Sequence, residues 1–319
     1  MDITTFDYNG LHRVIDADLK TLRGRDSIVW VDVIAPPLHE LDRLQNAFGF
    51  HPLAIEDTRN EHQRPKVEEY ADHLFIITNQ AMMVEGELVF QEVDIFLGKN
   101  YMVTIHHECA PLMLEVRQRM NQNTSFKHVS SEYLLYILLD TIVDGYFPLM
   151  DQFSIEIEKL EEEVLDRADR EMLRRMFELK RMLTEAWYVV GLERDMFSIL
   201  TRREEDFITH HDVLEYYLRD VKDHLLRVGD IISVLRENLT NVIDLYVSST
   251  SNRLNFVVNR LSIITITIGI MTVVSGFYGM NFEQTWPPFN SPWGVPYVLG
   301  LMIVLTGAVL AILKWLKFY

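Results

Sequence analysis

The chain has almost no cysteine, and several familiar motifs of catalysis and phosphate binding are absent. Cys109 is the single cysteine among 319 residues, so no disulfide can form within the chain and a cytosolic body is favoured. No glycine-rich phosphate loop occurs, which argues against a nucleotide-driven pump. No His-Glu-x-x-His motif or cysteine pair predicts a zinc site. The first residues lack a basic region followed by an apolar core, so no cleaved signal peptide is expected.

Positive charge is also scarce, and it is unevenly distributed. The chain carries 30 Lys and Arg against 47 Asp and Glu, a formal net charge of −17. From Arg253 onward there are four basic residues and one acid, whereas the preceding 252 residues hold 26 basic and 46 acidic residues. This balance argues against nucleic acid as a partner, because phosphates require a basic surface. It suits a body that concentrates cations, although solubility alone explains it equally well.

Proline is missing from most of the second half of the chain. Between Pro111 and Pro287 only Pro148 occurs, and the pattern there is helical. We expect one helix over 131–167, a second over 170–200 and a third over 212–278, the last roughly 100 Å long at about 1.5 Å per residue. The third carries a heptad seam that predicts packing along a partner helix, for which a copy of itself is one candidate. The seam consists of Val221, Leu225, Val228, Ile232, Leu235, Leu239 and Val242.

The first 125 residues alternate between strand-like and helix-like patterns. Strands are expected over 27–34, 74–83, 88–97 and 101–106, with helices over 38–48 and 51–57. This predicts an α/β domain with a mixed sheet. The expected organisation is an α/β domain over 1–125, a long-helix region over 126–252 and a membrane domain over 253–319.

Two uncharged runs near the C-terminus are long enough to cross about 30 Å of hydrocarbon. They cover 261–278 and 295–313, and predict a first span at about 258–278, an outer loop over 279–294 and a second span at about 295–314. Two buried core helices are the alternative. Four basic residues flank the spans on one side, which places both termini in the cytoplasm and the protein in the plasma membrane. They are Arg253, Arg260, Lys314 and Lys317.

The first span carries a stripe of small and hydroxylated residues without an acid. Two helices cannot enclose a water-filled path, so an ion path along this stripe requires several copies around an axis. A small-residue stripe is equally typical of tight helix packing in lipid. A non-conducting, membrane-anchored interaction protein is therefore the rival interpretation. The stripe consists of Asn255, Val258, Ser262, Thr265, Gly269, Thr272 and Gly276.

The first span ends in Tyr278, Gly279, Met280 and Asn281. A Gly-Met-Asn triplet at the end of the first of two C-terminal spans resembles the hallmark of the CorA family of divalent-cation channels. The resemblance continues, in the same order along the chain, in four further segments. They are 51–57 (HPLAIED), 62–68 (HQRPKVE), 96–101 (FLGKNY) and 244–249 (DLYVSS).

The resemblance implies a passive homopentameric channel, not an enzyme, with Mg²⁺ as both cargo and regulator and with no organic cofactor. Co²⁺ and Ni²⁺ are further expected cargoes. The Gly279 to Asn281 segment with Tyr278 would form an outer filter. Neutral oxygens suit an ion that gives up its water reluctantly. Glu283 follows in the outer loop. The pore-lining positions would be Asn255, Val258, Leu261, Ser262, Thr265, Gly269 and Thr272, with Asp244 at the inner mouth.

The resemblance also implies a cytoplasmic cation sensor between neighbouring copies. Asp220 matches one acid of that sensor, and Glu85 of the neighbouring α/β domain is the partner that we expect. Many relatives carry methionine where this chain has Val258 and Gly269, and the outer loop lacks a Met-Pro-Glu-Leu run. A zinc transporter of the same superfamily therefore remains the alternative.

Two further groups of side chains invite a metal interpretation. His106 and His107 are adjacent on an expected strand and would point to opposite faces, so they are not expected to share a metal. Six acids between Glu156 and Asp166 predict a solvated helix face, with concentration of cations as a second interpretation.

Overall fold

The computed structural model describes residues 1–7, 10–14, 19–22, 27–60, 62–108, 111–122, 130–166, 169–201, 211–280, 286 and 292–315. The chain forms two compact units. The first unit comprises Met1–Glu162 and Arg170–Val242, and the second comprises Glu163–Asp169 and Ile243–Tyr319.

A seven-stranded mixed sheet forms the base of the first unit. Its strand order is β2-β1-β3-β7-β6-β5-β4, and β3 and β7 pair in parallel while the other neighbours are antiparallel. The mixed sheet and the four expected strands are confirmed, whereas the sequence patterns did not indicate β1, β2 and β4. The strands are β1 (Asp2–Asp7), β2 (Gly10–Val14), β3 (Ile28–Ile34), β4 (Lys66–Tyr70), β5 (His73–Val84), β6 (Glu87–Gly98) and β7 (Tyr101–His106).

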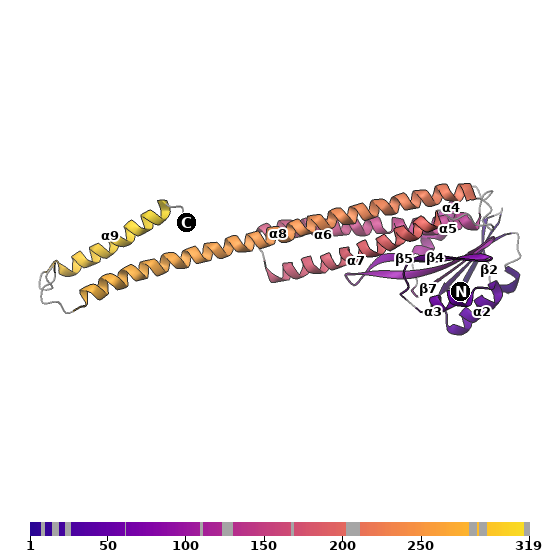
Figure 1. Cartoon of the computed structure of the whole chain (residues 1–319), viewed down its shortest axis with the longest axis horizontal. Helices are drawn as coiled ribbons and strands as arrows, with labels where there is room; N and C mark the ends of the chain where they lie inside the picture. Colours follow the sequence, from indigo (N-terminus) through magenta and orange to yellow (C-terminus); the bar gives the residue numbers. More distant parts are fainter. Residues whose placement is uncertain are drawn as a thin grey trace. The chain divides into compact units, whose positions relative to one another are not determined.

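Each face of the sheet is covered by helices (Figure 1). One face packs against α1 (Leu19–Leu22), α2 (Leu38–Phe48) and α3 (Pro52–Arg59), and this core includes Leu44, Phe48, Ile55 and Phe96, all at most 1% exposed. Gly49 ends α2 in the left-handed conformation at φ 76°, which glycine adopts without a steric penalty. The other face lies under α5 and α7.

The helical part of the first unit differs from the sequence prediction at one point. The single helix expected over 131–167 is divided at Gly145 into α5 (Ser131–Asp144) and α6 (Tyr146–Asp166). Glycine is a weak helix former, and Pro148 lacks the N–H that would bond to the carbonyl of Asp144. The remaining helices of this part are α4 (Pro111–Gln122), α7 (Arg170–Leu200) and the first part of α8.

Helix α8 runs uninterrupted from His211 to Tyr278, 68 residues, as the lack of proline predicted. Its seven seam residues are all at most 4% exposed. Other helices of the same chain bury the seam, and α7 is one of them. Gly229 lies against Val190, and the Arg236 guanidinium stacks over the Trp187 ring at 5.1 Å. The copy of α8 that the sequence analysis offered as a partner is therefore not needed to bury the seam.

The second unit contains the rest of α8 and α9 (Gly294–Trp315). By length and composition, three helical stretches among the described residues could cross a membrane. The stretch Ser131–Leu165 has 67% of its most apolar window buried, so most of its apolar surface already packs inside the protein. The corresponding windows of α8 and α9 are 6% and 0% buried, which makes these two helices the apolar surfaces that lack cover.

Candidate cation sites

The C-terminal end of α8 closes in a tight cap. The N–H of Gly279 donates to the carbonyls of Ser275 at 2.9 Å and Gly276 at 3.2 Å. A Cβ on Gly279 would lie 3.1 Å from the Ser275 carbonyl oxygen, so a larger residue must push this backbone aside. The Tyr278 hydroxyl donates to the Trp286 carbonyl at 3.2 Å and so connects Trp286 to the helix end. Asn281 and Glu283, the other two residues expected here, lie outside the described residues.

The stripe expected to line a pore lies open along α8. Val258 is 49% exposed and Leu261 is 58% exposed, and both contribute to a groove with Ser262 and Thr265. A Cβ on Gly269 would meet open space. Asn255 and Thr272 are also exposed. The structure thus presents these seven positions on an uncovered face of α8, with six of them exposed and Ser262 half-buried.

The hydroxyls of this face have a defined polarity. Ser262, Thr265 and Thr272 each donate to the carbonyl four residues earlier, at 2.9 Å in all three cases. A hydroxyl whose proton is used in this way offers its lone pairs outward as acceptors. Water bound to a cation presents its hydrogens outward, so these hydroxyls can receive a hydrated cation. Asp244, which precedes this face on α8, is an exposed carboxylate.

The two acids expected to form a sensor lie in different surroundings in the chain. Glu85 is exposed in the β5–β6 turn at φ 52°, next to Glu87, which pairs with Arg181 of α7. Asp220 is exposed on α8 and lies near α5. Burial, followed by the charges of Asp140 and Asp220, raises the pKa of Tyr136 to about 12. Whether Asp220 meets a Glu85 from another copy stays a prediction.

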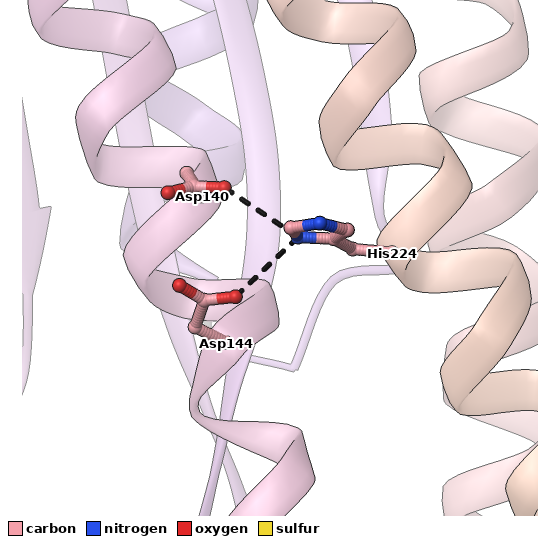
Figure 2. Close-up of side chains that lie close together, drawn as sticks. All are labelled: Asp140, Asp144 and His224. Carbon is pink, nitrogen blue, oxygen red and sulfur yellow. Dashed lines mark ion pairs between the residues drawn. The ribbon is translucent and has the colours of Figure 1, made fainter.

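A second group of possible ligands, which no sequence pattern had indicated, consists of Asp140, Asp144 and His224 (Figure 2). Asp140 and Asp144 are one turn apart on α5, and His224 faces them from α8. The His224 Nδ1 atom lies 3.7 Å from the Asp140 Oδ1 atom and 3.4 Å from the Asp144 Oδ1 atom. Within the described residues, these three ligand atoms form the group close enough to hold a metal ion, all within 4.8 Å of one another.

The electrostatics of this acid–histidine cluster favour a bound cation. Asp140 is 4% exposed, and burial together with the charge of Asp144 raises the pKa of its carboxyl. The Asp140 Oδ1 and His224 Nδ1 atoms are buried without a hydrogen-bond partner. A buried polar atom left unpaired costs free energy, and a cation between the three groups would remove that cost. Two carboxylate oxygens and one imidazole nitrogen suit Mg²⁺ only in part and transition metals well.

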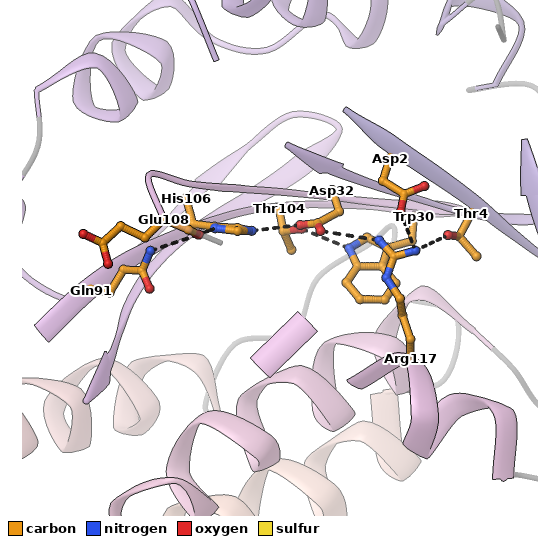
Figure 3. Close-up of polar contacts among 9 residues, drawn as sticks. All are labelled: Asp2, Thr4, Trp30, Asp32, Gln91, Thr104, His106, Glu108 and Arg117. Carbon is orange, nitrogen blue, oxygen red and sulfur yellow. Dashed lines mark hydrogen bonds and ion pairs between the residues drawn. The ribbon is translucent and has the colours of Figure 1, made fainter. Parts of the chain in front are cut away.

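A third polar group connects neighbouring strands of the sheet through hydrogen bonds and ion pairs, and its side chains pair with one another (Figure 3). Thr104 donates to Asp32 at 2.7 Å, and the His106 Nε2 atom lies 3.2 Å from the same carboxylate oxygen. Burial works against ionisation of Asp32, but hydrogen bonds from His106 and Thr104 keep its pKa below the usual value. Arg117 of α4 pairs with the other carboxylate oxygen of Asp32 at 3.4 Å. His106 thus points into this network, whereas His107 is exposed.

The acid–histidine cluster had one weak sequence signal. Asp140 and Asp144 interrupt an otherwise apolar helix at a spacing of four, which places both on one face. No pattern could indicate that His224, 80 residues after Asp144, faces them, because the contact depends on how α5 and α8 pack.

These features define a class of protein. An acidic α/β and helical body is joined by one long helix to exposed apolar helices, which are compatible with transmembrane segments. The chain belongs to the CorA family: the family model described as "CorA-like Mg2+ transporter protein" matches residues 25–315.

Relatives of known name agree with this assignment. The chain is 35% identical over 289 residues to the cobalt/magnesium transport protein CorA of Thermotoga maritima, covering 89% of this chain and 81% of that one. It is 26% identical over 284 residues to the protein of the same name from Methanocaldococcus jannaschii, covering 87% of each. The complete structure of the CorA magnesium transporter from M. jannaschii matches with a TM-score of 0.86 at 22% identity, covering 98% of this chain and 97% of that one.

Proposed function

We propose that this chain is a passive channel for divalent cations, with Mg²⁺ as the main cargo and Co²⁺ and Ni²⁺ also admitted. The observation that carries the proposal is the uncovered face of α8. It offers neutral oxygen acceptors from Ser262, Thr265 and Thr272, and it ends at the capped turn of Gly279. Family membership and the names of the relatives supply the class of cargo.

The pore requires several copies of the chain. One face of one helix cannot enclose water, so we propose a homopentamer in which α8 of each copy lines a central path. Residues 1–125 and 126–252 form the cytoplasmic body, and residues 253–319 form the membrane domain of a plasma-membrane protein with both termini inside. A membrane potential supplies about 4.6 kcal/mol per divalent ion for each 100 mV, so neither a nucleotide nor an organic cofactor is required.

The outer filter and the inner constriction have different chemistry. The Gly279 carbonyl and the Asn281 amide oxygen contact the hydration shell of the entering ion, in the segment that also holds Tyr278 and Met280. Neutral oxygens bind Mg²⁺ without stripping its water or holding it too tightly to leave. Val258 and Leu261 form an apolar constriction that gates by excluding water. Asp244 supplies a carboxylate ring at the inner mouth, and Glu283 attracts cations outside.

Cation binding in the body closes the channel. The site proposed is the acid–histidine cluster together with Asp220, which lies one turn before His224 on the same face of α8. A divalent cation joins α5 to α8 there, and its loss leaves the carboxylates to repel one another. The binding therefore shifts the population toward the closed state. Glu85 of a neighbouring copy remains the proposed further ligand for Asp220.

Uptake of Mg²⁺ into liposomes that contain the purified full-length protein tests the channel. Wild type is compared with Asn281→Ala, which removes the filter oxygen, and with Asn241→Ala, the same change at an exposed position on α8 of the first unit. We expect at least tenfold slower uptake by Asn281→Ala and unchanged uptake by Asn241→Ala.

Equal uptake by wild type and Asn281→Ala would remove Asn281 from the filter. Absence of uptake by all three proteins would favour a non-conducting, membrane-anchored interaction protein. Uptake of Zn²⁺ that exceeds uptake of Mg²⁺ at equal concentration would assign the chain to zinc transport instead.

A further inference from the structure

Helix α4 carries two arginines that point in opposite directions. Arg117 holds the sheet: its guanidinium lies 3.0 Å from Asp2, 2.9 Å from Thr4 and 3.4 Å from Asp32 (Figure 3). Arg119 holds α5: it lies 2.9 Å from the Asp140 Oδ2 atom, 3.3 Å from the Asp144 Oδ2 atom and 2.8 Å from the Thr141 hydroxyl. Residues two apart on a helix are about 200° apart, so these contacts lie on opposite sides of α4.

The carboxylates of Asp140 and Asp144 therefore interact with Arg119 through one oxygen each and with His224 through the other. Their Oδ2 atoms face the Arg119 guanidinium, and their Oδ1 atoms face the His224 Nδ1 atom. On the arginine side the negative charge is already paired. On the histidine side the Asp140 Oδ1 and His224 Nδ1 atoms lack a hydrogen-bond partner. A cation that binds on the histidine side thus meets acids whose charge is partly compensated.

We propose that Arg119 is the built-in counter-cation of this cluster and sets its affinity for divalent cations. The inference rests on the proposed function, since it takes the cluster to be the cation sensor. With Arg119 present, the two carboxylates and the guanidinium carry a net charge of −1, and without it −2. An ion on the histidine side is therefore bound more weakly than the two carboxylates alone would bind it.

The contacts of Arg117 fix α4, so the Arg119 guanidinium and a bound cation compete for the same two carboxylates. Because Arg117 holds the opposite side of the helix to the sheet, the Arg119 guanidinium stays near the carboxylates when an ion binds. Orientation of the carboxylates is the competing role for Arg119. That role predicts the opposite result, because loss of an orienting contact weakens metal binding.

Co²⁺ binding to the purified full-length protein, measured by calorimetry, separates the two roles. Arg119→Gln removes the charge and retains hydrogen-bonding capacity. We expect its dissociation constant at the cluster to be about tenfold lower than that of wild type, equivalent to about 1.4 kcal/mol. The cluster is identified as the site whose Co²⁺ binding Asp144→Asn weakens by about tenfold or more.

Two further variants keep the test decisive. Arg119→Lys retains the charge, but its ammonium can lie close to only one carboxylate and compensates the other less. We therefore expect a dissociation constant between those of wild type and Arg119→Gln, about threefold lower than that of wild type. It carries the test alone if Arg119→Gln does not fold. Arg174→Gln is the matched control, because it removes one positive charge from an exposed i,i+3 pair with Glu171 on α7, and its binding should equal that of wild type.

An affinity in the Arg119 variants that equals or falls below that of wild type overturns the inference and leaves the proposed sensor standing. If wild type has no Co²⁺ site that Asp144→Asn weakens, the proposed sensor is overturned, and this inference with it. Mg²⁺ uptake by wild type and Asn281→Ala tests the pore separately, so a failure of the pore proposal can be told apart from a failure of this inference.

Discussion

Helix α8 belongs to both units, and its apolar residues are buried in the first unit and exposed in the second. In the first unit Leu225 and Val228 are completely buried against the neighbouring helices, whereas in the second unit Val258 is 49% and Leu261 58% exposed. The difference shows that the first unit completes its core within one chain. In the second unit the apolar surface stays open, and we propose that a lipid bilayer and further copies of the chain cover it.

The two units also differ in the oxygens that they offer to cations. The first unit presents carboxylates and an imidazole that can hold an ion. The second unit presents hydroxyl oxygens, and we propose that these pass an ion on. A sensor must retain its ion long enough to change the conformation, whereas a pore must release it. Substitutions at sites in both units challenge this comparison, beginning with the largest expected effect.

Truncation of one leucine in each unit tests the comparison along a single helix. We expect Leu225→Ala to lower the stability of the folded body by about 2–5 kcal/mol, because it leaves a cavity in a closed core. Leu261→Ala should change that stability by less than about 1 kcal/mol and should instead raise the leak of ions, because it widens an apolar constriction. Thermal unfolding of the purified protein and liposome flux measure the two effects. Equal losses of stability in the two variants would contradict the difference between a buried first unit and an exposed second unit.

Removal of the sensor carboxylates should affect closure and leave the pore intact. We expect Asp144→Asn and Asp220→Ala each to raise the internal Mg²⁺ concentration needed for closure by about tenfold, with the open-channel flux unchanged. The physical reason is the loss of one anionic ligand, worth roughly 1–2 kcal/mol. Flux at stepped internal Mg²⁺ measures this shift. An unchanged Mg²⁺ dependence removes that acid from the sensor.

Glu193 should make the stability of the first unit depend on pH. Burial raises the pKa of its carboxyl from 4.5 to about 8, although the Asn79 N–H at 2.6 Å and the Thr78 hydroxyl favour the ionised form. Below about pH 4.5 the carboxyl is protonated in both states, and the folded state incurs no penalty. Between 4.5 and 8 only the unfolded state ionises, so stability falls by up to about 1.4 kcal/mol per pH unit.

Glu193→Gln removes this ionisation. Thermal unfolding of the variant should therefore show a smaller loss of stability between pH 5 and 8 than wild type does. An identical pH dependence in both proteins would show that Glu193 is already ionised in the fold.

Tyr278→Phe should have the smallest effect. It removes one exposed hydrogen bond, from the Tyr278 hydroxyl to the Trp286 carbonyl at 3.2 Å, worth about 0.5–1.5 kcal/mol. We expect uptake to fall by less than about threefold, since the Gly279 cap persists. A complete loss of uptake would give Tyr278 a direct role in the filter.

Periodicity and the lack of proline predicted the long helices, because a seven-residue repeat over 22 residues leaves few alternatives. The bounds of α7 and α8 came within a residue of those observed. The edge strands β2 and β4 were missed because each has five residues and little alternation. The break at Gly145 was missed because an apolar helical pattern continues across it.

The candidate sites also differ in how far the sequence could predict them. The stripe on α8 is local to one helix, so its spacing alone places Val258, Ser262 and Thr265 on one face. The acid–histidine cluster joins α5 to α8 across 80 residues of sequence, and its Arg119 comes from a third helix. No local pattern encodes such a contact.

The central claim is that the second unit conducts divalent cations down an electrical gradient. Mg²⁺ entry into liposomes that contain only the wild-type protein, with the potential set by a potassium gradient and an ionophore, tests it most directly. We predict that entry without nucleotide accelerates as the interior is made more negative and slows when the potential is reversed. Entry that does not respond to the potential, or no entry at any potential, would contradict the claim.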